Sequence, residues 1–81
     1  MNEQDLINEL KRMYETAADK KQVASIHLFG IKYADELKNQ NLKIIAEKAT
    51  GKSSYYSEIN KGMSLKSLLQ EEDYKKLNKF H

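Results

Sequence analysis

Polar and apolar residues follow each other along this chain with the spacing of an α-helix. Between residues 2 and 18 one apolar stripe recurs every three or four positions, and Asn2 and Asp5 are placed to form a reciprocal capping box at its start. The stripe consists of Leu6, Ile7, Leu10, Met13, Tyr14 and Ala17. We therefore expect a first helix over residues 2–18, followed by a polar joint in which Asp19 caps the next helix.

A second, more apolar helix is expected over residues 20–39. Its seam, at alternating spacings of three and four, is Val23, Ile26, Gly30, Tyr33 and Leu37. Gly30 costs about 1 kcal/mol relative to alanine in a helix interior, so it marks either a close approach by another helix or a break. We favour close packing. The seam itself can support the core or form a homodimer interface by helix-on-helix packing.

The stretch from Asn41 to Gly62, which reads NLKIIAEKATGKSSYYSEINKG, predicts two short helices joined by a turn. Asn41 is a suitable N-cap for a helix over residues 42–49, and residues 50–52 contain the glycine of a turn. Two helices joined in this way have the layout of a helix-turn-helix.

The second helix of this pair is expected to start at Ser53 or Ser54, either of which can act as its N-cap, and to run to about Lys61. Gly62 is placed to end it in the left-handed conformation that glycine adopts without strain. A short fifth helix is expected around residues 64–69. The tail that follows has acids before lysines, the order that complements a helix dipole.

Composition favours one all-α domain. The 81 residues include 40% hydrophobic and 32% charged residues, with three glycines, no proline and no cysteine. Such a chain can bury one modest core, has few helix breakers, and excludes disulfides and thiolate metal sites. We expect a compact single domain of five to six helices over residues 1–81. Within it, a helical hairpin at 1–40 supports or dimerises the domain, the helix-turn-helix occupies 41–62, and C-terminal helices occupy 63–81.

Residues 41–62 resemble the helix-turn-helix of the lambda-repressor-like (Cro/repressor) superfamily. The matching positions are the cap Asn41, the first anchor Ile45-Ala46, the middle apolar residue Tyr56, the second anchor Ser57-Glu58-Ile59 and the stop Gly62. The resemblance implies that the small Ala46 lies where the two helices cross, while Tyr56 and Ile59 face the core. The turn glycine, Gly51, falls one position later than is usual in that superfamily.

A second string, IHLFGIKYADEL at residues 26–37, is similar to one found in small bacterial helix-turn-helix-like domains. Together the resemblances imply a small protein of bacterial or phage origin that binds double-stranded DNA as a transcriptional regulator or accessory factor. The alternative is a protein-interaction adaptor that keeps the fold without specific DNA binding. The alternative is favoured by Leu42, by Glu58 and by a modest charge excess of +3 over residues 41–66, where five lysines oppose two glutamates.

Docking of the repressor type implies that the start of the second helix meets base edges in the major groove. The residues that then contact DNA are Lys43, Lys52, Ser53, Ser54, Tyr55, Ser57 and Lys61. Serine hydroxyls discriminate bases weakly, so we expect modest sequence specificity from one copy. Adjacent residues on a helix point about 100° apart, and by register we expect Tyr56 in the core and Tyr55 in solvent.

Neither catalysis nor a metal site is indicated. His27 lies on an apolar helix and is expected to be satisfied or half-exposed, and two isolated histidines without cysteine make no recognisable zinc site. We find no nucleophile–base pairing or glycine loop, so we expect no enzyme activity and no cofactor. Glu58 is expected to pair with Lys61 at the surface. The short apolar runs exclude a signal peptide or membrane span, which makes the cytoplasm the default compartment.

Overall fold

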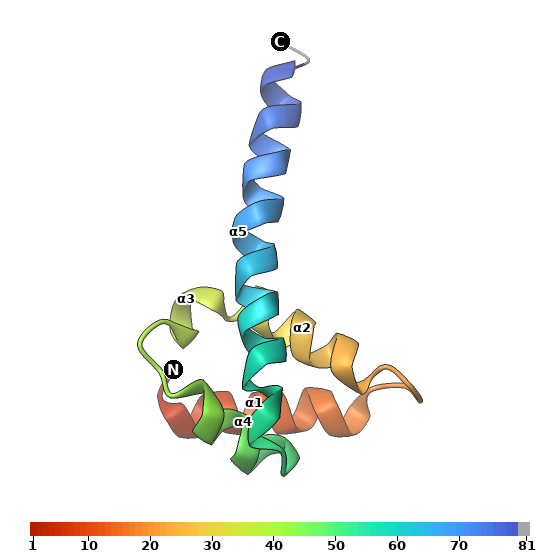
Figure 1. Cartoon of the computed structure of the whole chain (residues 1–81), viewed down its shortest axis with the longest axis vertical. Coiled ribbons are helices and arrows are strands. Elements are labelled where there is room, and N and C mark those ends of the chain that lie inside the picture. The colour runs from red at the N-terminus through yellow and green to blue at the C-terminus, as the bar shows by residue number, and fades with distance from the viewer. Residues whose placement is uncertain (80–81) are drawn as a thin grey trace.

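The computed structural model describes the backbone of residues 1–79 and the side chains of residues 1–69. Within that range every regular element is helical, which confirms the all-α class expected from the apolar spacing. The elements are α1 (Glu3–Thr16), α2 (Gln22–Lys32), α3 (Ala34–Leu37), α4 (Leu42–Thr50), the 3-10 turn η1 (Ser53–Tyr55) and α5 (Tyr56–Lys79). Figure 1 shows α5 as a long rod that rises out of the group of shorter helices.

The first helix begins as its sequence predicts. The Asn2 side chain accepts a hydrogen bond from the Asp5 N–H at 2.8 Å, and the Asp5 carboxylate accepts one from the Asn2 N–H at 3.2 Å. This reciprocal capping box satisfies two backbone donors that the first turn of a helix leaves free. The expected cap of the second helix is wrong, because α2 starts after Lys21 without a side-chain hydrogen bond from Asp19 or any other residue.

The single helix expected over residues 20–39 is divided. The backbone leaves the helical conformation at Tyr33 (φ −113°, ψ 24°), and a single turn, α3, follows. The change of direction keeps both Ala34 and Leu37 buried. On α3, Asp35 accepts a hydrogen bond from the Lys66 ammonium of α5 at 3.4 Å, so α3 is also tied to the long helix.

Gly30 and Gly62 bring α2 and α5 together at backbone contact. A Cβ placed on Gly30 would lie 2.9 Å from the Cα of Gly62, a distance that real Cβ atoms do not tolerate. The expectation of close packing at Gly30 is therefore confirmed. The expectation that Gly62 ends a helix is wrong, because α5 runs through it to Lys79.

The separate fifth helix expected around residues 64–69 is likewise part of α5. A buried glycine in the middle of a helix meets the need for close helix contact, and in α5 that need overrides the low helix propensity of glycine. Residues 80–81 of the expected C-terminal segment lie outside the described residues.

The core is assembled from every α-helix of the described chain. Its fully buried large side chains are Leu6, Leu10, Ile26, Phe29, Leu37, Ile45 and Ile59. The seam expected on the second helix lies largely in this core, with Ile26, Gly30 and Leu37 buried within the one chain. That seam therefore supports the core. In the described part of the chain, no helix combines the length and hydropathy that crossing a membrane requires.

Candidate nucleic-acid interface

The turn between α4 and α5 is built by Thr50 and Gly51. Gly51 has φ 83°, in the left-handed region that glycine adopts without strain, and ends α4. The Thr50 hydroxyl donates to the Ala46 carbonyl at 2.7 Å and accepts from the Lys52 N–H at 3.2 Å. These contacts turn the chain sharply, so that η1 and α5 start directly beside the end of α4.

Three residues were expected to join α4 and α5 in the core: Ala46, Tyr56 and Ile59. Ala46 and Ile59 lie there as expected. Ala46 and Ile59 are both fully buried in the same apolar cluster. The small side chain of Ala46 permits the close approach that Ile59 fills. Asn41 caps α4 as expected, since its side chain accepts from the Ile44 N–H at 3.2 Å.

The two tyrosines at the start of α5 are arranged in the opposite way from the expected one. Tyr55 is half-buried against the core, with its ring centroid 6.0 Å from that of Tyr14 on α1, whereas Tyr56 is 39% exposed. Burial, together with the nearby Tyr55 hydroxyl, raises the pKa of Tyr14. The expected exposure of Tyr55 and the expected core position of Tyr56 are both wrong.

Helical register from Ile59 and cover by α1 together explain why Tyr55 is the more buried of the two tyrosines. Tyr55 lies four residues before Ile59 and about 40° from it around the helix, while Tyr56 lies three residues before and about 60° away on the other side. The side of Tyr55 is the one that α1 covers through Tyr14. Tyr55, Ile59 and Met63 are each four residues apart, and together they define the face of α5 and η1 that packs against the core.

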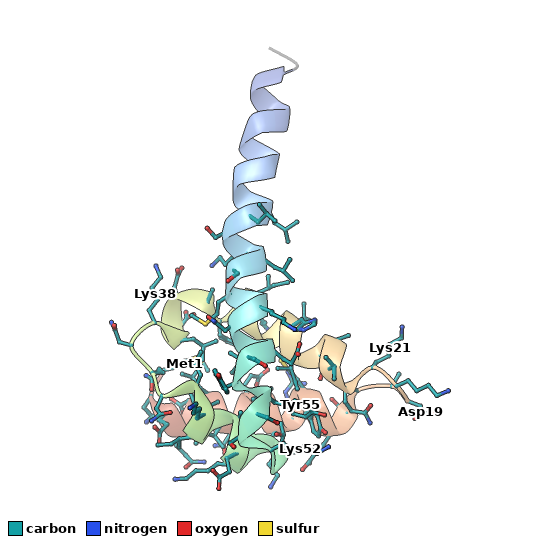
Figure 2. All side chains as sticks on the ribbon, viewed as in Figure 1. Met1, Asp19, Lys21, Lys38, Lys52 and Tyr55 are labelled. Carbon is teal, nitrogen blue, oxygen red and sulfur yellow. The ribbon has the colours of Figure 1, made fainter. Side chains whose placement is uncertain are left out.

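Tyr56 is the residue that sequence reasoning missed at this surface. The Lys43 ammonium of α4 lies 5.0 Å from the centroid of the exposed Tyr56 ring, and the Lys52 ammonium lies 5.4 Å from that of Tyr55. Each of these two adjacent tyrosines therefore has a lysine ammonium over its ring. Figure 2 shows Lys52 and Tyr55 at the lower end of the molecule, far from Lys38.

The serines of the expected contact surface lie at the same place. Ser53 and Ser54 are exposed on η1, and the partly buried Ser57 donates its hydroxyl proton to the Ser54 carbonyl at 3.1 Å. The expectation that Ser53 or Ser54 caps the helix is wrong, because the chain enters α5 through a 3-10 turn without a side-chain cap. Their hydroxyls are thus free of a capping role.

Glu58 is directed toward α2 and interacts with two side chains, His27 and Lys61. Its carboxylate forms a short hydrogen bond with Nε2 of His27 and an ion pair with the Lys61 ammonium at 3.2 Å. The hydrogen bond from His27, followed by that from Lys61, lowers the pKa of Glu58. The expected pair with Lys61 and the expected half-exposed, satisfied His27 are both confirmed. The link between His27 and Glu58 spans 31 residues and carries no signal in the sequence.

The site residues form two groups along α5. At the start of the helix, Lys43 lies over the Tyr56 ring and Lys52 over the half-buried Tyr55 ring, and Ser53 and Ser54 are exposed beside them. Ser57 and Lys61 follow on the side of α5 opposite the buried Ile59, and the Lys61 side chain is exposed while paired with Glu58. No group of three or more His, Cys, Asp or Glu side chains converges among residues 1–69 in a way that could hold a metal ion.

Comparison with known proteins agrees with the helix-turn-helix reading at the level of the family. A family described as HTH-like domain matches residues 2–72, which is most of the chain. No curated protein and no solved structure matches, and the comparisons do not identify the repressor/Cro type. An HTH-like domain suggests a DNA-binding or regulatory role in general, and such families are typically non-enzymatic. The α4–turn–α5 geometry and this match together show that the chain belongs to the HTH-like domain family.

Proposed function

We propose that this protein binds double-stranded DNA with the start of α5 and acts as a bacterial or phage transcriptional regulator or accessory factor in the cytoplasm. The observation that carries the proposal is that two adjacent tyrosines at the helix start each have a lysine over the ring, Lys43 over the exposed Tyr56 and Lys52 over Tyr55. Cations on either side of a helix start, directly after a tight turn, are suited to hold phosphates while that start enters the major groove.

The pairing of the Glu58 carboxylate also supports DNA binding by this surface. A free carboxylate beside the groove would repel phosphate, but Glu58 is mostly buried and is bonded to His27 and Lys61. The positive field of Lys43 and Lys52 is therefore little opposed from this side. A few lysines give attraction that is steeply dependent on salt.

The chemistry at the helix start favours weak discrimination between bases. Ser53 and Ser54 offer hydroxyls that suit either a base edge or a phosphate, and the Tyr56 ring can contact a thymine methyl group or a sugar. No arginine or glutamine is present on the segment from Lys52 to Lys61 to make a bidentate base contact. We therefore expect binding that depends more on charge than on sequence.

The test is a titration of a mixed-sequence duplex at low salt, followed by fluorescence anisotropy. Lys52→Glu is expected to weaken binding about tenfold or more, a loss of about 1.4 kcal/mol, and Lys43→Glu is expected to act in the same direction. Lys38→Glu is the control, because Lys38 is an exposed lysine at a distant part of the surface, where it pairs with Asp35 at 3.6 Å (Figure 2). Equal affinities for the Lys52 and Lys38 variants would refute the proposed docking.

A protein-interaction adaptor is the second candidate, and it is favoured by exposed apolar side chains on elements outside the proposed DNA surface. Leu28, Leu65 and Leu68 are 55%, 38% and 54% exposed. Nonspecific DNA binding by other proteins has dissociation constants of about 10⁻⁴–10⁻⁶ M at physiological salt. Absence of any anisotropy change at low salt, at protein concentrations of tens of micromolar, would favour the adaptor.

A further inference from the structure

A groove between α1 and α2 lies apart from the proposed DNA surface. It has a volume of about 550 Å³ and is open to solvent on one side. Its apolar lining comes from Met13, Ala17, Ala24 and the half-exposed Leu28. Alanines leave space that a larger apolar side chain can fill, so the groove has the shape that receives an amphipathic helix.

The rim of this groove is positively charged. Arg12, Lys21 and Lys32 line it, and the ten described residues of the lining include no aspartate or glutamate. Arg12 is paired with Glu9, so the net positive charge comes from Lys21 and Lys32. Figure 2 shows Lys21 extending from the loop after α1, away from α5. An occupant that complements this site carries leucine-sized side chains together with acidic residues.

The chain itself contains such a segment. On α5, Leu65, Leu68 and Leu69 are 38%, 54% and 50% exposed, on the part of the helix that rises out of the other helices (Figure 1). The sequence continues directly with the acidic residues Glu71, Glu72 and Asp73. A helix that extends into solvent gains most of its stability from a packing partner, since isolated helices of this length are marginal in water.

We propose that two copies of this chain form a closed dimer in which the Leu65–Leu69 turn of each α5 packs in the α1–α2 groove of the other copy. The leucines fill the space above the alanines, and the negative charge that follows Leu69 in the sequence complements Lys21 and Lys32. This interface is distinct from the seam of α2 that the core buries. The proposed dimer is independent of the proposed DNA binding, and it is tested on the protein alone, without DNA.

Sedimentation equilibrium of the full chain is the first test. The wild type is expected at twice the 9.4 kDa mass of one chain, and Leu28→Asp is expected to reduce it to one chain mass. Val23→Asp, on the same helix but outside the groove lining, is the matched control and should keep the dimer, with circular dichroism checking that each variant is folded. A wild type that stays at one chain mass across micromolar concentrations, or a folded Leu28→Asp variant that stays dimeric, overturns the proposal.

Charge exchange identifies the occupant. A chain with Lys21→Glu and Lys32→Glu, and a second chain with Glu71→Lys and Glu72→Lys, should each sediment as single chains. Each has lost the attraction between groove and helix, but the groove of either one fits the α5 of the other. An equimolar mixture is therefore expected to return to twice the chain mass. A mixture that remains monomeric shows that α5 is not the occupant of the groove.

Discussion

Gly30 and Gly62 face each other where α2 crosses α5, so close that neither can carry a side chain without moving a backbone. A Cβ on Gly62 would meet the Cα of Gly30 at 2.9 Å and would also collide with the His27 carbonyl. The same crossing brings His27 to Glu58, one turn before Gly62 on α5. The glycine pair therefore sets the position of α5, including the start of the helix that is proposed to read DNA.

Gly62→Ala is expected to destabilise the fold although alanine is the better helix former. The gain in helix propensity is about 1 kcal/mol. Separating two backbones costs about 1–3 kcal/mol or more, and no flexible side chain is present to yield. The melting temperature should fall by several degrees, since about 4–8 °C corresponds to 1 kcal/mol in a domain of this size. Ser64→Ala, at an exposed position of the same helix, should leave it nearly unchanged.

Tyr55→Ala and Tyr56→Ala are expected to separate stability from binding. Loss of the half-buried Tyr55 ring and its contact with Tyr14 should reduce the free energy of unfolding by about 2 kcal/mol. Loss of the exposed Tyr56 ring should cost less than about 1 kcal/mol but weaken DNA binding. Thermal melts and duplex titrations of both variants measure the two effects. The reverse pattern would show that the observed register is wrong.

Asn2→Ala removes one half of the capping box on α1. The Asp5 N–H then has no side-chain acceptor, and a loss of about 1 kcal/mol is expected from N-cap replacements. Chemical denaturation should show a lower midpoint with an unchanged slope. Asn8→Ala, at an exposed position within the same helix, is the control, and an equal loss in both variants would argue against the cap.

The Glu58 carboxylate should make stability depend on pH in the acid range. Its pKa is held below the ordinary value of 4.5 by the hydrogen bonds from His27 and Lys61, so its contribution is fully present above 4.5. That contribution is lost as pH falls through the lower pKa of the folded state. The melting temperature of wild type should therefore exceed that of Glu58→Gln near neutral pH, and the difference should shrink below pH 4.5. A difference that is constant with pH would contradict the role of the ionised carboxylate.

Most features that depend on neighbours in sequence could be predicted, although the caps expected at Asp19 and at Ser53 or Ser54 are wrong. Among tertiary contacts, the close packing at Gly30 was predicted, but its partner Gly62 was not. The Asn2 and Asn41 caps, the Gly51 turn and the Ala46–Ile59 crossing all follow from local spacing. Gly62 has the local signature of a helix stop, and only the approach of Gly30 from another helix explains why α5 continues through it.

The reversed burial of Tyr55 and Tyr56, relative to the prediction, also depends on a tertiary contact. Both Tyr55 and Tyr56 are within about 60° of Ile59 around the helix, so the register alone does not choose between them. The choice is made by Tyr14, which covers one side from α1. Gly51 lies one position later than the turn glycine of the repressor pattern. This is the sequence signal that the second helix starts differently here, and the structure has a 3-10 turn, η1, before α5.

The salt dependence of duplex binding tests the proposed DNA-binding role most directly. Between about 50 and 200 mM salt, the affinity of the wild type should fall steeply, and Lys52→Gln should reduce the slope of log K against log salt by about 1, because one phosphate contact is lost. Lys38→Gln should leave the slope unchanged. A slope that Lys52→Gln does not alter, or duplex binding that does not depend on salt, would contradict phosphate contact by the surface at the start of α5.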